Sequence, residues 1–290
     1  MKAEFIVITP ARNEAAYIGE TIKSVLSQTV LPSMWVIVDD GSSDDTANIA
    51  EEAARAHPWI RVVRRKDRGY RDMHGGLVAV IYEGLRHITA TDYEFLFNID
   101  ADRVFGPNYF RTILNKFKEN PELGIASGVV YENFKGKLIR MKGLPWPTSG
   151  GIKCWRRKCF EQIGGLVRGL VWDGIDCFKA MMLGWQTKTF EGQELMVIHL
   201  RPEGSSDRSI LQGFVRRGRG HHWVASHPLW VLASAGCHML DYPYVMGGGA
   251  MIIGYLQAIL QGSEQLGDEE LKRFLRKFQI AKLSRILRLR

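Results

Sequence analysis

Residues 95–103 read Phe-Leu-Phe-Asn-Ile-Asp-Ala-Asp-Arg, and this stretch decides the fold. It begins as a short apolar run, which predicts a strand buried inside a sheet. It ends in two acids one residue apart, Asp100 and Asp102. Hard divalent cations prefer carboxylate oxygens, and a magnesium or manganese ion held by such a pair can bind a diphosphate. A surface turn explains the same residues, because aspartate is common in turns, so the pattern needs support from the rest of the chain.

Size and composition indicate a globular protein with free thiols. The chain has 290 residues, 46% of them hydrophobic, which is enough for one large domain or a domain with an appendage. Residues 1–10 have the pattern of a first strand and not of a signal peptide. The four cysteines form no C-x-x-C pair, so we expect free thiols and a cytoplasmic protein.

The net charge of +8 is concentrated in the C-terminal tail. Residues 271–290 contain eight Lys or Arg and no acid, which leaves 31 basic and 31 acidic residues in the remaining chain. Nucleic-acid binding needs a basic face. The neutral main body therefore argues against a nucleic-acid partner.

Strands alternate with helical patterns through the first half of the chain. Apolar runs predict strands at 4–10, 35–38 and 60–63, and apolar periodicity predicts helices at 15–29, 46–57 and 77–87. This alternation predicts an α/β protein with a doubly wound sheet, in which ligands bind beyond the carboxyl ends of the strands. Polar loops follow three of these ends, at 9–14, 39–46 and 100–103.

The loop after the second strand carries two acids, Asp39 and Asp40, directly at the strand end. Helix capping explains the hydroxyls and acids from Ser43 to Thr46, but it does not explain the two acids. A carboxylate at this place can accept hydrogen bonds from a nucleobase or a ribose. The chain lacks a G-x-G-x-x-G phosphate loop, which argues against a Rossmann dehydrogenase.

Three motifs, in this order, resemble the nucleotide-sugar glycosyltransferases of family 2, which have the GT-A fold. They are T-P-A-R-N-E at 9–14, V-D-D-G-S-S-D-D-T at 38–46 and D-A-D at 100–102, and the resemblance covers about residues 4–202. It implies a nucleotide-binding set of Pro10, Arg12, Glu14, Asp40, Arg68 and Asp100. It also implies a metal set of Asp100, Asp102 and His199 for Mn²⁺ or Mg²⁺, in which Asp102 is the direct ligand. A solvent-facing histidine at the end of a strand is the alternative for His199.

Residues 172–185 resemble the family segment that contains the catalytic base. Asp173 takes the base position, but Trp172 replaces the glutamate of the family and the second acid is displaced to Asp176. The base is therefore Asp173 or Asp176. The family is inverting, so the resemblance implies a single displacement assisted by one carboxylate base.

Aromatic and basic residues around this segment are candidates for acceptor and phosphate contacts. Trp146 and Trp155 lie in a stretch similar to the acceptor side of the family, where they either stack on a sugar or pack in the core. Five arginines follow the last predicted strand, partly in an expected Gly-rich loop at 213–220, and could clamp phosphates: Arg201, Arg208, Arg216, Arg217 and Arg219. A solvated or lipid-facing basic loop is the alternative for each.

The C-terminal third changes in composition. From His221 to Ser263 the only formally charged residue is Asp241. Two apolar segments, 223–240 and 250–260, flank an expected turn that contains Gly247 to Gly249, and each is short for a membrane span. The tail from Leu271 predicts a basic amphipathic helix on an anionic membrane surface. Packing on the catalytic domain or between copies of the chain is the alternative.

These patterns predict a GT-A catalytic domain at 1–220 with a doubly wound mixed sheet, and a helical appendage at 221–290. The expected activity is metal-dependent, inverting transfer of a sugar from a UDP- or GDP-linked donor to a glycan or polyprenyl-linked acceptor. We expect it on the inner face of the cell membrane, in polysaccharide or glycolipid assembly. A non-catalytic nucleotide-sugar-binding protein is one alternative. A nucleotidyltransferase is another, although residues 10–14 lack the glycines of its phosphate loop.

Overall fold

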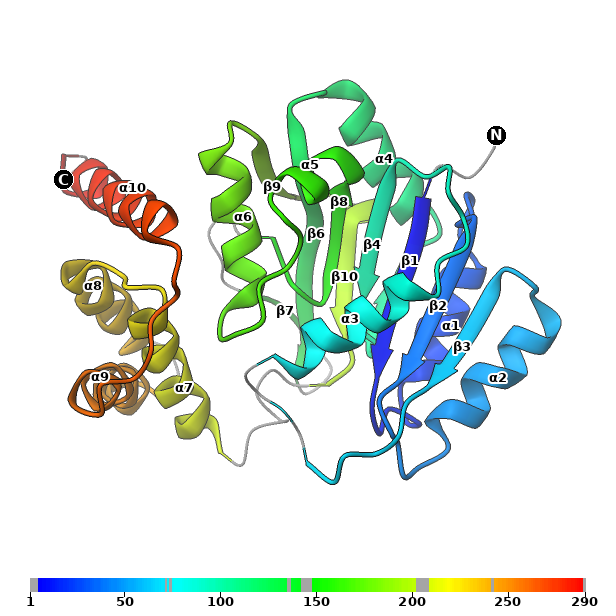
Figure 1. Cartoon of the computed structure of the whole chain (residues 1–290), viewed down its shortest axis with the longest axis horizontal. Coiled ribbons are helices and arrows are strands. Elements are labelled where there is room, and N and C mark those ends of the chain that lie inside the picture. Colours follow the sequence, from blue (N-terminus) through cyan, green and yellow to red (C-terminus); the bar gives the residue numbers. More distant parts are fainter. Residues whose placement is uncertain are drawn as a thin grey trace. The chain divides into compact units, whose positions relative to one another are not determined.

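The computed structural model describes residues 5–70, 72, 75–134, 137–141, 148–201, 209–240 and 243–288. The chain divides into two compact units, Met1–Pro202 and Glu203–Arg290. Figure 1 follows their helices and strands in chain order. Residue 220, the expected end of the catalytic domain, lies inside helix α7 (Ile210–Trp223).

The first unit is built on one mixed sheet. Its ten strands in the described residues follow the path β3-β2-β1-β4-β8-β6-β10-β5, with β7 and β9 also paired to β6. β1 to β4 run parallel, so the carboxyl ends of β1, β2 and β4 meet at one edge, whereas β8 is antiparallel to β4 and β6. The strands are β1 Phe5–Ala11, β2 Met34–Asp39, β3 Ile60–Arg64, β4 Phe95–Ile99, β5 Arg103–Phe105, β6 Leu123–Phe134, β7 Lys137–Arg140, β8 Ile152–Arg156, β9 Gln186–Phe190 and β10 Met196–His199.

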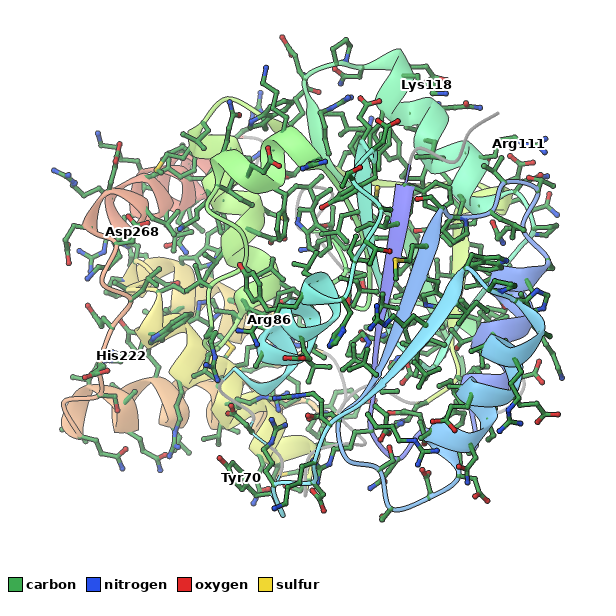
Figure 2. The ribbon with its side chains drawn as sticks, turned by 45° about the vertical axis from the view of Figure 1, so that its right-hand side comes forward. Tyr70, Arg86, Arg111, Lys118, His222 and Asp268 are labelled. Carbon is green, nitrogen blue, oxygen red and sulfur yellow. The ribbon has the colours of Figure 1, made fainter. Side chains whose placement is uncertain are left out.

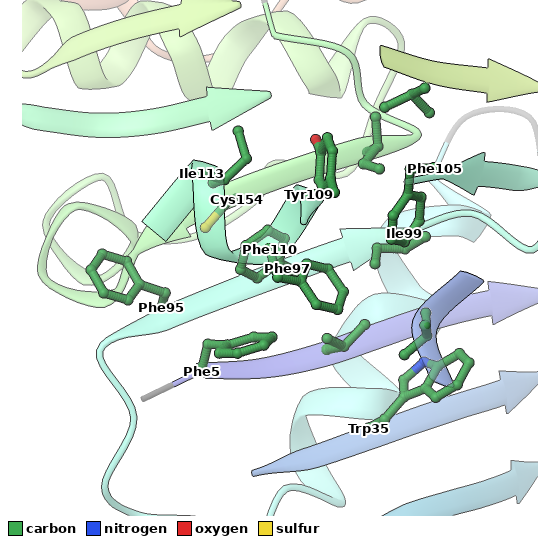
Figure 3. Close-up of a cluster of buried hydrophobic side chains, with 14 of the residues drawn as sticks. Phe5, Trp35, Phe95, Phe97, Ile99, Phe105, Tyr109, Phe110, Ile113 and Cys154 are labelled. Atoms are coloured by element: carbon green, nitrogen blue, oxygen red, sulfur yellow. The ribbon is translucent and has the colours of Figure 1, made fainter. Parts of the chain in front are cut away.

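Helices cover both faces of this sheet, because successive residues of its buried strands point to opposite sides. On β1, Phe5 and Val7 enter one apolar cluster, while Ile6 and Ile8 enter another. The first cluster, shown in Figure 3, packs against α1 (Ile18–Leu26), α2 (Thr46–Ala56) and α4 (Tyr109–Glu119). The second packs against α3 (Gly76–Arg86), α5 (Arg157–Gln162) and α6 (Trp172–Met182). The predicted α/β sheet with helices on both faces is confirmed.

The spacing of apolar residues in helix α4 determines which side of the helix packs against the sheet. Phe110, Ile113 and Phe117 recur at helical spacing and are buried against the sheet. Arg111 and Lys118 lie on the opposite, exposed side, as Figure 2 shows. The short helix η1 (Gln193–Leu195) precedes β10.

The second unit is helical throughout its regular structure. It consists, within the described residues, of α7, α8 (Pro228–His238), α9 (Val245–Leu260) and α10 (Glu269–Arg288). Val231, Ala235 and Met251 form its small buried cluster. In the part of the chain that the structure describes, no helix combines the length and the apolar character needed to cross a membrane.

Two glycine-rich stretches are helical, which corrects the expected loop and turn. Residues 213–220 lie within α7, and Gly247 to Gly249 lie within α9. The glycines let these two helices approach closely. A Cβ atom added to Gly218 would lie 1.9 Å from the carbonyl oxygen of Met251, and one added to Gly254 would lie 2.0 Å from that of Val215. These glycines therefore serve close helix packing and not the loop and turn that we expected.

Replacing Gly254 with alanine should destabilise the second unit by on the order of 2 kcal/mol, because the added methyl group forces α7 and α9 apart. Urea unfolding followed by circular dichroism measures this effect. Gly236→Ala is the matched control, because Gly236 is an exposed residue of α8 with open space around its Cβ position. The control should stabilise the protein by about 0.5–1 kcal/mol. Equal effects of the two substitutions would contradict the packing role.

Candidate functional site

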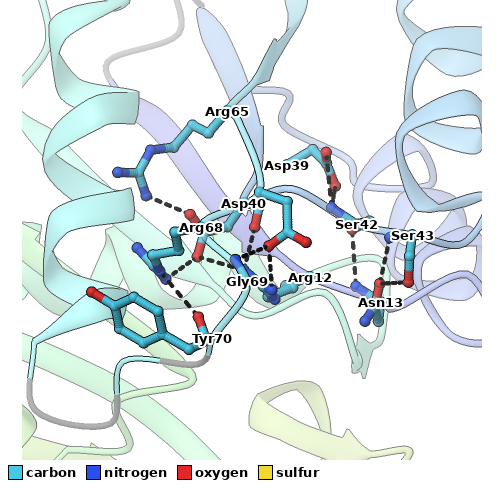
Figure 4. Close-up of polar contacts among 11 residues, drawn as sticks. Arg12, Asn13, Asp39, Asp40, Ser42, Ser43, Arg65, Arg68, Gly69 and Tyr70 are labelled. Carbon is cyan, nitrogen blue, oxygen red and sulfur yellow. Dashed lines mark hydrogen bonds and ion pairs between the residues drawn. The ribbon is translucent and has the colours of Figure 1, made fainter.

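Asp40 follows β2, and the segments after β1 and β3 bring arginines around it (Figure 4). Asp40 accepts hydrogen bonds from Arg65 and Arg68, and Arg12 Nη1 donates to its carbonyl oxygen at 2.8 Å. The other Nη of Arg12 lies 2.6 Å from Asp67. The carboxylate of Asp40 is thus bound by Arg65 and Arg68. Of these, Arg68 was expected from the sequence and Arg65 was not.

Asp39 is the less engaged acid of the pair. Within the described part of the chain, its two carboxylate oxygens accept only the backbone N–H of Ser42, each at 3.3 Å. Asn13 supports the same turn from the β1 loop by accepting the N–H of Ser43 at 2.8 Å. Pro10 is buried within β1 beside Val38, so it fixes the course of the chain before this loop.

The end of β4 meets β10 through the short strand β5. Residue 199 of β10 pairs with residue 103 of β5, so His199 faces the acids that precede β5. His199 Nε2 lies 3.1 Å from Asp102 Oδ2, and His199 Nδ1 lies 3.5 Å from Glu132 Oε1. Arg103 Nε lies 3.4 Å from Asp102 Oδ1, and Arg103 Nη2 lies 3.9 Å from Asp100 Oδ2. The structure thus brings together three expected residues and adds Arg103 and Glu132.

Arg201 connects this cluster to the β1 loop. One of its Nη atoms donates to Glu14, and its Nε lies 3.7 Å from Asp102 Oδ2. Burial raises the pKa of Glu14 to about 7, although Arg201 lowers it. Glu14 and Arg201 therefore lie with the Asp102 cluster.

Burial and charge separate the two aspartates of the D-A-D motif. Burial raises the pKa of Asp100 to about 6, against the opposing charge of Arg103. Burial also raises the pKa of Asp102, but the hydrogen bond from His199 and the charge of Arg103 outweigh it and lower that pKa overall. The two carboxyl groups therefore differ in acidity although only one residue separates them.

The residues fit a divalent cation by their chemistry. Carboxylate oxygens and an imidazole nitrogen suit Mn²⁺ and, for the oxygens, Mg²⁺. Among the described residues Asp102 Oδ1 is buried with no hydrogen-bond partner, although Arg103 Nε lies 3.4 Å from it, so this oxygen is a candidate ligand atom for a cation. Within the described ranges no three His, Cys, Asp or Glu side chains already stand in the arrangement of a metal site. The ligand atoms that suit a divalent cation are present in Asp100, Asp102 and His199. Binding of the cation would require these side chains to move closer to one another.

Gly150 and Gly151 lie between this cluster and α6. A Cβ atom on Gly151 would lie 2.6 Å from Asp100 Oδ2 and 2.5 Å from an Nη atom of Arg103. A Cβ atom on Gly150 would lie 3.0 Å from Asp173 Oδ2. The glycine pair thus lets the acids of the strand end and the acid of α6 approach the same short stretch of backbone.

Asp173 and Asp176 occupy different environments on α6. Asp173 is partly exposed beside Gly150, whereas Asp176 is buried. Asp176 accepts hydrogen bonds from Lys153 Nζ at 3.0 Å and from the indole N–H of Trp155 at 2.8 Å. The sequence reasoning missed Lys153, because a single lysine in a strand gives no sign of a buried partner.

Trp155 corrects an expectation, since its ring is fully buried in the core and has no face open to a sugar. Arg217 belongs to the second unit, where its Nη1 lies 2.9 Å from His238 Nε2. Its contact with phosphate stays a prediction. Trp146 and Arg208 lie outside the described residues.

Gly151→Ala should weaken Mn²⁺ binding about tenfold or more, because the added methyl group displaces Asp100 and Arg103. Isothermal titration with MnCl₂ measures the affinity, and a thermal melt checks that the variant is folded. Gly106→Ala is the matched control, because a Cβ atom there meets nothing within 4 Å. A folded Gly151→Ala variant with unchanged Mn²⁺ affinity would show that these side chains do not bind the ion.

Comparison with known proteins identifies the family. The model of glycosyl transferase family 2 matches residues 6–184, more than half of the chain. The poly-beta-1,6-N-acetyl-D-glucosamine synthase of Staphylococcus epidermidis is 31% identical over 116 residues, which are 40% of this chain and 26% of that protein. The match thus spans about a quarter of the length of that curated relative.

Solved structures share the fold at low sequence identity. The mannosyltransferase PcManGT from Pyrobaculum calidifontis, in complex with GDP-Man and Mn²⁺, has a TM-score of 0.57 at 16% identity, covering 99% of this chain and 88% of that chain. A fragment of S. aureus TarS in complex with UDP-GlcNAc has a TM-score of 0.53 at 14% identity. The similarity covers 89% of this chain and 73% of the TarS chain. The predicted GT-A fold and family resemblance are confirmed. The chain belongs to glycosyl transferase family 2.

Proposed function

We propose that the chain is a metal-dependent, inverting glycosyltransferase that moves a sugar from a nucleotide-diphosphate donor to a glycan or lipid-linked acceptor. The observation that carries this proposal is the approach of two acidic groups to one glycine pair, with Asp100 at Gly151 and Asp173 at Gly150. Inverting transfer needs a positive charge on the diphosphate and a base on the opposite side of the sugar. Asp100, together with Asp102, would hold the cation that supplies the first requirement, and Asp173 would supply the second.

The nucleotide is assigned to the segments after β1, β2 and β3. Arg12, Asp40 and Arg68 form its charged wall together with Arg65. Asp39 joins this set, because two long hydrogen bonds leave its carboxylate free to accept from a base or ribose. PcManGT was solved with GDP-Man and TarS with UDP-GlcNAc, which supports a UDP- or GDP-linked sugar as the donor.

The donor diphosphate is assigned to the cluster of Asp100, Asp102 and His199. These three residues would hold Mn²⁺ or Mg²⁺, the first of which is present in the PcManGT complex. Such an ion, when bound, offsets the negative charge that develops on the leaving diphosphate. Arg201 Nε lies 3.7 Å from Asp102 Oδ2. Arg201 would donate hydrogen bonds to the phosphate oxygens after its hydrogen bond to Glu14 breaks.

Asp173 is the proposed base. It is partly exposed, next to a glycine, on the first turn of α6. Asp176 is buried, and its oxygens already accept from Lys153 and Trp155, so it has no lone pair directed to an acceptor hydroxyl. Asp173 would take the proton of that hydroxyl as the oxygen attacks the anomeric carbon. The match to a polysaccharide synthase supports a glycan or lipid-linked glycan as acceptor, in cell-surface polysaccharide or glycolipid assembly.

Asp102→Asn tests the reaction and its metal together. Donor turnover should fall by more than about a hundredfold, and added Mn²⁺ should no longer stimulate it, because an amide is a poor ligand for these ions. The assay measures release of UDP or GDP from UDP-GlcNAc and GDP-mannose over a MnCl₂ titration. Glu52→Gln, at an exposed site on α2, is the control and should match the wild type. Undiminished, Mn²⁺-dependent turnover in Asp102→Asn would contradict the metal role.

We also propose that the second unit binds an anionic membrane surface, through α8 and α9. Both helices expose large apolar side chains, Leu229 and Leu232 on α8 and Ile253, Leu256 and Leu260 on α9. An exposed apolar surface of this kind marks an interaction site. No Lys, Arg, Asp or Glu occurs in either helix, so nothing charged has to enter the interface.

We propose that helix α10 contributes cations to membrane binding and not an apolar face. Leu271 and Leu275 are buried within the second unit, where Gln279 also bonds to His227. Arg273 and Lys277 are exposed. Cations beside an uncharged apolar surface suit anionic lipid headgroups, and such a surface would place the enzyme next to a polyprenyl-linked acceptor.

Ile253→Ser combined with Leu256→Ser should lower binding to phosphatidylglycerol-containing vesicles about tenfold or more, because two exposed apolar side chains are lost. Co-sedimentation measures the binding. Leu31→Ser, at an exposed leucine of the first unit, should change nothing. If the double variant still sediments but loses a dimer seen by light scattering, the surface is an interface between copies and not a membrane contact.

A further inference from the structure

Lys153 is a lysine on β8 whose side chain is completely buried. It pairs in the sheet with Asn98, two residues before Asp100. Burial is the largest single effect and lowers the pKa of Lys153, but the charges of Asp176, Cys177 and Asp173 and the hydrogen bond to Asp176 together raise it. A charge in such a place needs a full set of partners.

The ammonium group of Lys153 binds the first turn of α6. It lies 2.5 Å from the carbonyl oxygen of Asp173 and 3.0 Å from each carboxylate oxygen of Asp176. A lysine has three N–H donors, so these acceptors satisfy it. Lys153 also lies 5.8 Å from the ring centre of Trp172, which precedes Asp173.

The turn that Lys153 holds begins with an unfavourable backbone. Val171, directly before α6, has a φ of 51° and makes no side-chain cap to the helix. A β-branched residue rarely adopts this left-handed region, and such a conformation persists only where surrounding contacts impose it. Beyond Asp173, Asp176 bonds to both Lys153 and Trp155. Contacts from β8 thus fix the start of α6.

We infer that Lys153 is a positioning residue for the transfer reaction. It holds the backbone of Asp173 so that the carboxylate stays against Gly150, next to the donor site. This inference rests on the proposed function, in which Asp173 is the base. The side chain of Lys153 is fully buried, so it acts through Asp173, the residue whose carbonyl oxygen it binds.

A double variant separates positioning from stability. Lys153→Met alone leaves the buried carboxylate of Asp176 without its cation, so the melting temperature should fall by several degrees. Lys153→Met with Asp176→Leu replaces the ion pair by apolar groups and should recover the melting temperature. The contact with the Asp173 carbonyl is still missing, so kcat should stay about tenfold to a hundredfold below wild type, with donor KM within about twofold.

Two further variants define the controls. Arg156→Met, on the same strand, also removes bonds to backbone carbonyl oxygens, those of Leu123 and Phe117, but not near α6. It should lower the melting temperature and leave kcat within about twofold of wild type. Asp176→Asn keeps the bond between Lys153 and the Asp173 carbonyl, so it should lose stability and retain kcat within about threefold. It tests the inference even if the Lys153 variants do not fold.

The assay follows release of UDP or GDP from the donor, UDP-GlcNAc or GDP-mannose, that most raises the wild-type melting temperature with MnCl₂. A double variant that melts like wild type and has wild-type kcat would overturn the inference, as would an Asp176→Asn variant that loses kcat as Lys153→Met does. Asp173→Asn distinguishes failure of the proposed function. If Asp173→Asn retains turnover, Asp173 is not the base; if it loses turnover while the double variant does not, only the role of Lys153 fails.

Discussion

The close approach of side chains to Gly150 and Gly151 is the constraint on which the site depends. Consecutive Cα atoms lie about 3.8 Å apart, and Asp173 and Asp100 each press against one of the pair. The same backbone bonds to β4, since Asn98 donates to the Gly150 carbonyl at 2.8 Å and the Asp100 N–H donates to that of Gly151 at 2.9 Å. A side chain at Gly150 would displace Asp173 on α6, and one at Gly151 would displace Asp100 and Arg103 at the strand end. The absence of two Cβ atoms therefore sets the distance between the two acidic groups.

Crowded acids need compensating charge, and the fold provides it from distant parts of the chain. Arg103 follows the acids on β5, whereas His199 and Arg201 arrive with β10. Compensation is incomplete, because burial still raises the pKa of Asp100 to about 6 and that of Glu14 to about 7. Carboxyl groups that bind a divalent cation must be deprotonated, so binding of an ion here would release protons from them. The shortage of positive charge around these acids would also favour binding of the cation.

The sequence predicted the parts of this arrangement that follow from local pattern. Buried parallel strands are apolar runs, and Asp100 and Asp102 directly follow the carboxyl end of one of them, β4. It did not predict Lys153 or Arg65, because their partners lie 23 and 25 residues away and have no periodic signature. Glycine misled in the second unit, because a residue that favours turns also permits close helix packing, as Gly218 and Gly254 do. Trp155 misled because one aromatic residue suits a core and a sugar site equally.

The ion pair of Lys153 and Asp176 is hard to explain by stability alone. Two charges lose their hydration on burial, and well-packed apolar residues of similar volume are often as stable or more stable. What an apolar pair cannot provide is a donor to the carbonyl oxygen of Asp173, which Lys153 binds at 2.5 Å. The turn before it costs roughly 1–3 kcal/mol through the left-handed Val171, so directional contacts have to hold it. The buried charge thus gives α6 a fixed start, and that start determines where the Asp173 carboxylate lies.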